Sequence, residues 1–406
     1  GCGLTFLSSP VVEATVEKGA RLQGTKLQDD STSLKITTHK AIKWSSADLD
    51  PSTFEHPSSN PTRLKFKAAG DYFITLTAPV ISGPVSNAGR RSTSEFVIFK
   101  NGTALPEGPA RSTYIRHDTN EYYHTESSGH TAVPLRGISA NDYIEIKTKR
   151  THGTNSNETY LGTTTLYSEK VDSSRTIFSG TATRTVGGTN FNGGLSGLQW
   201  TAGAKDSGFT HSDSSNSHNI TLDAAGKYLV FANVPLDGAT ARASVKIEVK
   251  VGGTQVTGGH ASQGYIRNGD GIRDASLHWS GLVSTSSANQ VLTINLGADA
   301  GGSTVTVNGE KATVFIEKLP NTNSVFSASG TQLVSGNNWN PDSESEIKWS
   351  TQDTIDASKF THSTSSNSHK IFVDSAGDYL LIYNDALDGR VTRANPKVQV
   401  KVNGVT

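Results

Sequence analysis

Apolar and polar residues alternate along short segments throughout the chain, and the alternation is clearest around Gly226. Ile220 and Leu222 precede this glycine at a spacing of two, and Tyr228 and Val230 follow it at the same spacing. Because alternate side chains of a strand point to opposite faces, the segment predicts a half-buried hairpin. Glycine suits the turn since it adopts positive φ without a steric penalty. No segment shows a convincing helical period with end signals, so the pattern predicts an all-β chain.

The hairpin signal occurs three times, at intervals of about 150 residues, which is the size of a whole domain. The glycine and tyrosine of the motif are Gly70 and Tyr72, Gly226 and Tyr228, and Gly377 and Tyr379. Each copy follows a strand signal that ends in a tryptophan, namely Trp44, Trp200 and Trp349. We expect these tyrosines and tryptophans to lie in domain cores or at interfaces, because large aromatic side chains dominate both.

The repeat boundaries predict three domains in tandem. Residues 1–172 form the first repeat, residues 173–321 the second and residues 322–406 an incomplete third. The linkers are short, so neighbouring domains are expected to stack rigidly. Two explanations of the incomplete third repeat stay open: the chain is part of a longer fibre, which we favour, or a neighbouring chain supplies the remaining strands.

The order of glycine, tyrosine and a second aromatic residue resembles complement-globular-head and tumour-necrosis-factor-like jelly rolls. The residues that carry the resemblance include Phe231 and Tyr383 beside the three Gly-x-Tyr motifs. The resemblance implies tandem antiparallel jelly-roll sandwiches that assemble as trimers, with aromatic and apolar residues along the trimer axis. Phrases such as Ser-Asn-Ser-His and Tyr-Ile-Arg-Asn also look like repeats in surface proteins of marine phages and marine bacteria.

The composition supports a β protein with polar faces and excludes some partners. Lys and Arg number 37, as do Asp and Glu, so the formal net charge is zero and no net field favours nucleic acid or an anionic membrane. Cys2 is the only cysteine, which rules out an internal disulfide. No apolar run approaches the ~18 residues needed to span a bilayer.

Two Ser/Asn-rich loops each carry a pair of histidines, His211 with His218 and His362 with His369. Neutral imidazoles on facing arms of a hairpin could bind a transition metal, shared around a three-fold axis. The alternative is a structural loop in which the histidines form hydrogen bonds. The first repeat offers only His56 at this place, which favours the structural alternative.

A second candidate site lies in the loop from 268 to 274, where Asp270 and Asp274 could supply oxygen ligands to Ca²⁺. A solvated hairpin tip is the simpler interpretation, because the loop lacks the length and the terminal glutamate of an EF-hand. Arg116 and Arg267 each follow a Tyr-Ile pair, and we expect them to form ion pairs at an interface.

The sequence contains no nucleophile elbow, phosphate-binding loop or cysteine-based metal cluster. We therefore expect no enzymatic activity and no cofactor apart from the calcium or transition metal considered above. The first hypothesis is a structural and adhesive fibre or appendage subunit on a virion surface. It would form homotrimers, contact other appendage proteins, and reach a host receptor or glycan through its loops. The alternatives are an extracellular bacterial filament or adhesin subunit, and a soluble module that recognises carbohydrate or protein.

Overall fold

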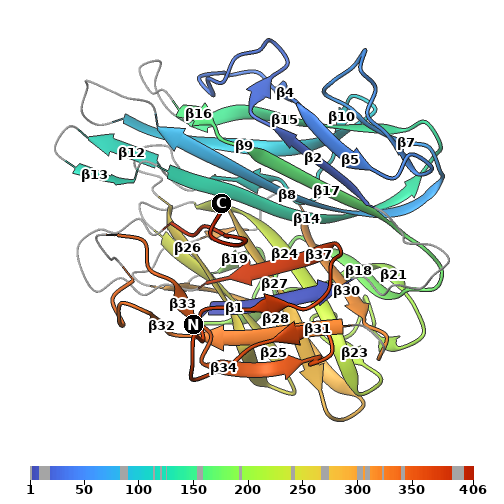
Figure 1. Ribbon diagram of the computed structural model, residues 1–406. Coiled ribbons are helices and arrows are strands. Elements are labelled where there is room, and N and C mark those ends of the chain that lie inside the picture. The colour runs from blue at the N-terminus through green and yellow to red at the C-terminus, as the bar shows by residue number, and fades with distance from the viewer. Residues whose placement is uncertain are drawn as a thin grey trace.

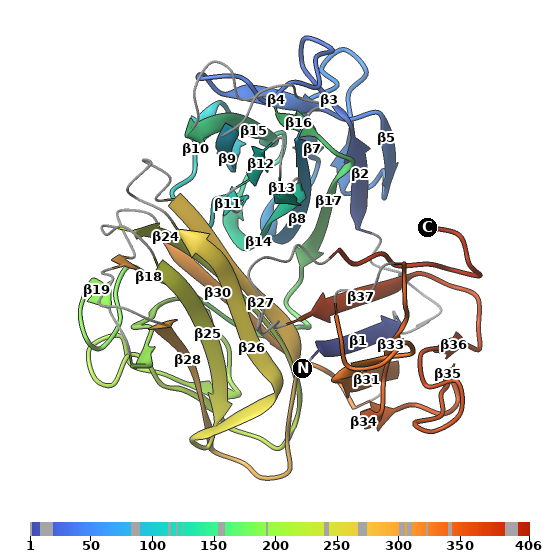
Figure 2. The ribbon, with the colours of Figure 1, turned by 90° about the vertical axis from the view of Figure 1, so that its left-hand side faces the viewer.

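The computed structural model describes residues 2–8, 19–82, 90–112, 115–118, 121–124, 126–152, 159–191, 194–238, 243–266, 274–299, 305–306, 311–321, 324–339, 343–385 and 397–406. Every regular element in these ranges is a strand, and the sheets are antiparallel. The chain forms antiparallel jelly-roll sandwiches, as the sequence predicts. Figure 1 shows the sheets stacked on one another, and Figure 2 shows three lobes that meet at the centre of the molecule.

The first repeat is a sandwich of two sheets. The sheet that faces the other repeats has the order β14-β8-β17-β2-β5, with β16 on β8. Its strands are β2 (Ala20–Gly24), β5 (Ser46–Leu49), β8 (Gly70–Ser82), β14 (Glu126–Ile138), β16 (Thr159–Leu161) and β17 (Thr164–Val171). The outer sheet contains β3 (Lys26–Leu27), β4 (Lys40–Lys43), β6 (Phe54–Glu55), β7 (Leu64–Phe66), β9 (Arg90–Lys100), β10 (Thr103–Ala104), β11 (Ala110–Arg111), β12 (Ile115–Asp118), β13 (Glu121–His124) and β15 (Tyr143–His152).

The second repeat has the same architecture. Its inner sheet runs β19-β29-β24-β30-β18-β21 with β27 on β24, and its outer sheet runs β22-β23-β28-β25-β26 with β20 on β28. The inner strands are β18 (Thr176–Ala182), β19 (Asn190–Phe191), β21 (Thr201–Lys205), β24 (Gly226–Gly238), β27 (Asp274–Thr285), β29 (Val305–Thr306) and β30 (Ala312–Lys318). The outer strands are β20 (Ser196–Gly197), β22 (Phe209–Thr210), β23 (Ile220–Leu222), β25 (Ala243–Val251), β26 (Thr254–Ile266) and β28 (Gln290–Asp299).

The third repeat contains a strand from the far end of the chain. Its four-stranded sheet has the order β34-β31-β1-β37, in which β1 is Cys2–Ser8. The other strands of this repeat are β31 (Ser324–Gly330), β32 (Gln332–Leu333), β33 (Ile347–Lys348), β34 (Thr351–Ile355), β35 (Phe360–Thr361), β36 (Phe372–Val373) and β37 (Tyr379–Asn384). The expected first repeat, residues 1–172, stays a prediction, and its first strand pairs here with strands of the third repeat. The physical reason is that β1 fills the gap between β31 and β37, whereas the first repeat fills its own gap with β17.

The register of β1 matches that of the strands that close the first two repeats. The motif tyrosine of each repeat faces the following partners across the ladder: Tyr72 faces Lys170 on β17, Tyr228 faces Lys318 on β30, and Tyr379 faces Ser8 on β1. Because register fixes which side chains face the core, the three sheets present the same faces. The third repeat therefore receives a strand from the same chain in the place of a closing strand.

Each repeat has a hydrophobic core between its sheets, and the predicted aromatic residues lie in these cores. Trp44 and Tyr72 are buried in the first core, and Trp200 and Tyr228 are buried in the second. Trp349 is buried in the smaller third core, where Tyr379 packs partly buried. The sequence predicted a position in a core or at an interface for these six residues. The structure places them in the cores of single repeats.

The Gly-x-Tyr motif builds the same hairpin corner three times. The hydroxyl of each tyrosine donates a hydrogen bond to the backbone carbonyl four residues earlier, at 2.7 Å from Tyr72 to Ala68 and 2.7 Å from Tyr228 to Ala224. In the third repeat Tyr379 donates to Ser375 at 2.6 Å. The glycines of the motif adopt φ values of 147°, 150° and 155° in chain order. L-residues with a side chain rarely adopt these angles, which explains why the turn carries glycine.

We expect Gly226→Ala to lower the free energy of unfolding by about 1–3 kcal/mol, because alanine at φ 150° is strained. Urea denaturation followed by tryptophan fluorescence measures this change. Gly194→Ala is the matched control, since no heavy atom lies within 4 Å of its added Cβ. An equal, small effect of both substitutions would contradict the backbone explanation.

Candidate functional site

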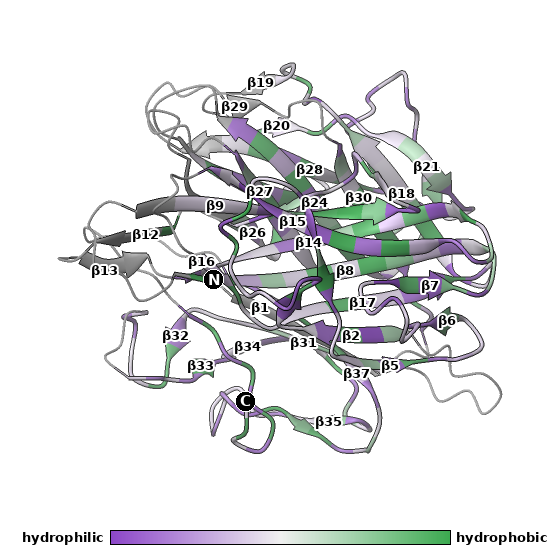
Figure 3. Cartoon of the chain, turned by 90° about the horizontal axis from the view of Figure 1, so that it is seen from above, coloured by the Kyte–Doolittle hydropathy of each residue, from purple (hydrophilic) through white to green (hydrophobic). Residues whose placement is uncertain are grey.

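A hydrophobic cluster joins the three repeats at the centre of the molecule, and we call it the axis cluster. The ring of Phe73 on β8 stacks on Phe315 of β30 with centroids 4.4 Å apart, and lies 4.8 Å from Phe231 of β24. Figure 3 shows hydrophobic segments of these strands gathered in the middle of the molecule. The other buried members are Ala132, Ile177, Leu229, Leu319, Val325 and Ile382. Aromatic and apolar residues were expected on an axis between chains, and here they lie between repeats of one chain.

The repeats are joined head to tail, and the same joint occurs twice. Strand β14 of the first repeat packs against β30 and β24 of the second, and β27 of the second packs against β1 and β37 of the third. In the first joint the hydroxyl of Thr313 donates a hydrogen bond to the carbonyl of Ala132 at 2.9 Å. In the second joint the amide of Asn384 donates to the carbonyl of Ser280. Ala132 and Ser280 occupy equivalent places on their strands, so both joints use the same carbonyl.

An ion triad lies beside the axis cluster, at the linker between the first two repeats. Arg175 donates to Glu169 of the first repeat at 2.7 Å and to Glu317 of the second at 2.8 Å. The side chains are 13%, 24% and 12% exposed in the order Arg175, Glu169, Glu317. Burial opposes the charge on Arg175, yet the two carboxylates raise its pKa above the ordinary value. Burial raises the pKa of Glu317, against the attraction of Arg175. The triad therefore couples the two repeats through one shared cation.

Two histidines face each other across the joint between the first and second repeats. The rings of His130 on β14 and His278 on β27 stack with centroids 6.1 Å apart. Burial lowers the pKa of His130 to about 4, and burial together with the charge of His130 lowers the pKa of His278 to about 3. His130 is exposed at the surface whereas His278 is half-buried, so desolvation acts mainly on His278. Both rings are neutral near pH 7.

We expect the free energy of unfolding to fall at acid pH, because the two histidines at this joint then become charged. A histidine whose pKa is depressed in the fold stabilises the fold fully above its unfolded pKa of about 6.5, and the stabilisation is lost as the pH falls from there toward 4. The slope is about 1.4 kcal/mol per pH unit for one ring that stays neutral in the fold. Thermal unfolding between pH 4 and pH 7 measures it, and His278→Gln should flatten the dependence. A dependence that His278→Gln leaves unchanged would rule out this origin.

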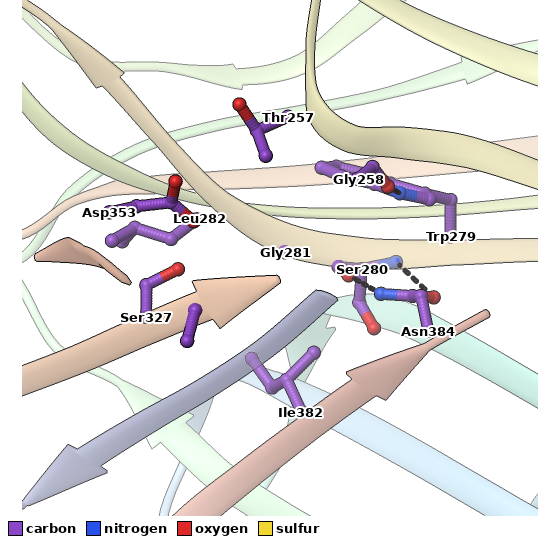
Figure 4. A pocket seen from close by; sticks show the side chains of 11 residues that line it. Thr257, Gly258, Trp279, Ser280, Gly281, Leu282, Ser327, Asp353, Ile382 and Asn384 are labelled. Atoms are coloured by element: carbon purple, nitrogen blue, oxygen red, sulfur yellow. Dashed lines mark hydrogen bonds between the residues drawn. The ribbon is translucent and has the colours of Figure 1, made fainter. Parts of the chain in front are cut away.

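A small cavity of about 20 Å³ lies between the second and third repeats. Figure 4 shows Ser280 and Asn384 joined by hydrogen bonds at one end and Asp353 at the other. Burial raises the pKa of Asp353, against a hydrogen bond from Ser327. A space of this size with polar walls holds about one water molecule. The cavity is therefore a small polar gap between the second and third repeats, and it is too small to hold a substrate.

The predicted metal histidines lie in loops that stabilise themselves through hydrogen bonds. His211 is buried, and its ring nitrogens lie 2.8 Å from the carbonyl of Asn219 and 3.2 Å from the carbonyl of Trp200. The ring nitrogens of His362 lie 3.2 Å from the side-chain amide oxygen of Gln352 and 3.1 Å from the carbonyl of Ser368. The second histidines of the two pairs, His218 and His369, are half-buried. Across the described ranges, no three His, Cys, Asp or Glu side chains gather where they could hold a metal ion. This geometry favours the structural interpretation of both loops.

The other predicted site residues are described only in part. Asp270 and Arg267 lie outside the described residues. Asp274 begins β27 and faces Asp237 across the ladder. The backbone of Arg116 on β12 pairs with His124 and with Arg91, and its side chain is outside the described part. The calcium site and the arginine ion pairs therefore stay predictions.

Sequence reasoning missed the residues that join the repeats, although one signal was present. Both full repeats end in a strand that carries Glu-Lys at its end, Glu169-Lys170 and Glu317-Lys318. An acidic residue repeated at the edge of a linker that contains Arg175 indicates an ion pair across that linker. The histidine pair has no local signal, because it forms only when the repeats pack together.

No family model matches the chain, and no curated protein sequence matches it. Solved structures match at low identity. Murine APRIL at pH 8.0 is 9% identical, with 36% of this chain and 99% of that chain covered and a TM-score of 0.26. Latent PorU of Porphyromonas gingivalis is 9% identical, with 73% and 22% covered and a TM-score of 0.21. Infectious bursal disease virus, Gx strain, is 12% identical, with 79% and 81% covered and a TM-score of 0.17. The fold assignment rests on the strand order and register rather than on these matches.

Proposed function

We propose that the protein is a non-enzymatic structural and recognition protein, a fibre or appendage subunit on a virion surface. The observation that carries the proposal is the axis cluster, which locks three jelly-roll repeats of one chain into a single body. A body whose repeats share a buried apolar cluster resists separation and proteolysis, as an exposed appendage requires. Loops at the ends of the sandwiches are the surfaces through which it contacts a host receptor or glycan.

The homotrimer expected from the resemblance is replaced in this proposal by three repeats of one chain. The axis that three chains would line is occupied by Phe73, Phe231 and Phe315 of a single chain. Light scattering after size exclusion tests this point. We expect a particle of one chain in dilute solution, and a stable particle of three chains as the smallest species would contradict it. No helix within the described residues is long and apolar enough to cross a bilayer.

Localisation tests the function itself. Gold-labelled antibodies raised against the chain are expected to decorate the surface of virions in electron micrographs. Decoration of filaments on bacterial cells would support the filament alternative instead. Label found only in the soluble fraction, together with binding on a glycan array, would favour the soluble recognition module.

A further inference from the structure

The outer sheet of the first repeat carries a row of basic side chains on the face that points away from the core. Alternate residues of β15 share this face, because the residues between them point into the sandwich. They are Tyr143, Glu145, Lys147 and Lys149, over about 20 Å of strand at about 3.4 Å per residue. Arg63 extends the row, since its guanidinium lies 4.0 Å from the ring centroid of Tyr143. We call these five residues the basic face.

A carboxylate beneath the middle of the basic face holds two of its cations. Glu145 lies 3.5 Å from Nζ of Lys147 and 4.0 Å from Nε of Arg63. The side chain of Glu145 is 11% exposed, whereas those of Lys147 and Arg63 are 22% and 35% exposed. The basic groups therefore form the layer that faces the solvent.

A second carboxylate, Glu95 on β9, does the same at the end of the row. It lies 3.3 Å from Nζ of Lys149, 3.4 Å from Nη2 of Arg111 and 3.1 Å from Nε2 of His39. Glu95 is 8% exposed and Lys149 is 34% exposed. Burial lowers the pKa of His39, against the attraction of Glu95, so its ring adds no permanent charge near pH 7.

The charges at this face do not balance. Four permanent cations surround the two carboxylates, which leaves two positive charges: the cations are Arg63, Arg111, Lys147 and Lys149. Ion pairs at the border are neutral, Lys65 with Glu55 and Lys100 with Asp142. Because the cations are in excess and lie nearer the solvent, the face attracts anions.

The second repeat forms the same sheet without these charges. Its strand β28 carries Thr293, Asn295 and Gly297 where β15 carries Glu145, Lys147 and Lys149. The inward residues are buried in both strands, as Ile146 and Ile294 show. The fold therefore does not require the charges of the basic face, which favours a role in binding.

The surroundings of β15 disfavour a peptide strand as the partner. The strand lies between β9 on one side and β4 and β7 on the other, so it has no free edge. A peptide that adds to a sheet needs such an edge. The available contacts are therefore those of charged side chains.

Nucleic acid fits the basic face poorly. The ring of Tyr143 lies beneath Arg63, and that of Phe99 lies 4.7 Å from Nζ of Lys147. A base would have to displace these cations in order to stack. Duplex DNA presents a charge about every 1.7 Å, whereas two strand positions, about 7 Å, separate Lys147 from Lys149. Anionic groups that are spaced by whole sugar rings match this sparse row better.

We propose that the basic face binds an anionic polysaccharide, whose sulfate or carboxylate groups contact Arg63, Lys147 and Lys149. The guanidinium binds two oxygens of one anionic group, and the ammonium groups act as point charges. This contact is made by a sheet face of the first repeat, in addition to the loops at the ends of the sandwiches. The inference rests on the proposed function, because it names the class of glycan that such a recognition protein contacts.

The experiment measures binding of the full chain to immobilised polysaccharides by biolayer interferometry. Dextran sulfate carries sulfate groups, polygalacturonate carries carboxylates, and unmodified dextran carries no charge; a short DNA duplex is the fourth ligand. The test variant carries Lys147→Gln and Lys149→Gln. The control variant carries Lys205→Gln and Lys250→Gln, which remove the same charge from the second repeat. A third variant, Lys147→Arg with Lys149→Arg, keeps the charge of the basic face.

We expect the chain to bind dextran sulfate or polygalacturonate but not dextran. The test variant should bind about tenfold more weakly, a loss of about 1.4 kcal/mol. The control and arginine variants should keep the affinity of the unchanged chain. Thermal unfolding checks the fold of each variant, and the single substitutions Lys147→Gln and Lys149→Gln take the place of the double variant if it does not fold.

Equal affinities of the test and control variants would overturn the assignment of binding to this face. Binding to neither charged polysaccharide, or tighter binding to the DNA duplex than to both, would overturn the choice of ligand. Antibody labelling of virions depends on none of these results, so failure here is distinguishable from failure of the proposed function.

Discussion

Replacing Arg175 by alanine is expected to lower the free energy of unfolding by about 3–5 kcal/mol, because it leaves two partly buried carboxylates without their shared cation. Glu169 and Glu317 would then repel each other across the joint between the first two repeats. Urea denaturation measures the loss, and added salt should restore little of it because buried charges are weakly screened.

Two further variants separate the ion triad from a general effect of losing an arginine. Arg184 is exposed, so Arg184→Ala is expected to change the unfolding free energy by no more than about 0.5 kcal/mol. The triple variant Arg175→Leu, Glu169→Gln and Glu317→Gln removes all three charges and should recover most of the stability, since an uncharged set avoids the desolvation cost. A triple variant as unstable as Arg175→Ala would show that packing, rather than charge, explains the loss.

Phe315→Ala is expected to cost about 3–5 kcal/mol and to uncouple the unfolding of the first repeat from that of the second. Phe315 points away from the core of its own repeat and stacks on Phe73 of the first. Its truncation therefore opens a cavity at the joint while the second core stays intact. Differential scanning calorimetry should show the single transition dividing into two.

Phe209→Ala provides the control for this division. Phe209 is buried in the core of the second repeat, so its loss has a comparable cost but no direct effect on the joint. We expect the second repeat to melt earlier in this variant, while the coupling to the first repeat persists. If Phe209→Ala and Phe315→Ala gave the same calorimetric profile, the axis cluster would not be the element that couples the repeats.

The fold could be predicted from the sequence where the signals are local. The alternation around Gly226 and the Gly-x-Tyr motifs identify the central hairpins, because side-chain direction and positive φ are decided by neighbouring residues. Trp44 and Trp200 mark the cores for a similar reason, since a large apolar ring must be buried somewhere in its own domain.

The arrangement of the repeats could not be predicted, because it depends on residues far apart in the sequence. Nothing local indicates that Ser8 faces Tyr379, since a strand is compatible with many partners until register and packing select one. The histidine pair is similar. His130 and His278 lie at equivalent places in two repeats, but only the joint brings their rings together.

Of the candidate sites, the histidine loops show how a repeated motif can suggest chemistry that packing explains. His211 recurs as His362 because both loops need a planar ring against a phenylalanine, Phe178 in one repeat and Phe326 in the other, at 5.1 Å in each case. Two backbone carbonyls then lie beside the ring nitrogens of His211, and the N–H of a neutral ring donates to one of them. In both loops the repeated histidine therefore packs inside the loop rather than binding a metal ion.

The head-to-tail joint sets a limit on the number of repeats in one body. Both joints pack an edge strand of one repeat, β14 or β27, against two neighbouring strands of the next, so successive repeats are related by a similar rotation. Such a rotation either closes a ring or continues as a helix. The axis cluster collects Phe73, Phe231 and Ile382 from three repeats at one centre, so a fourth repeat joined in the same way would have to displace one of them. A further repeat would have to start a second body, displaced along the axis. A longer array of this unit would therefore grow in steps of three repeats, as a column of rosettes.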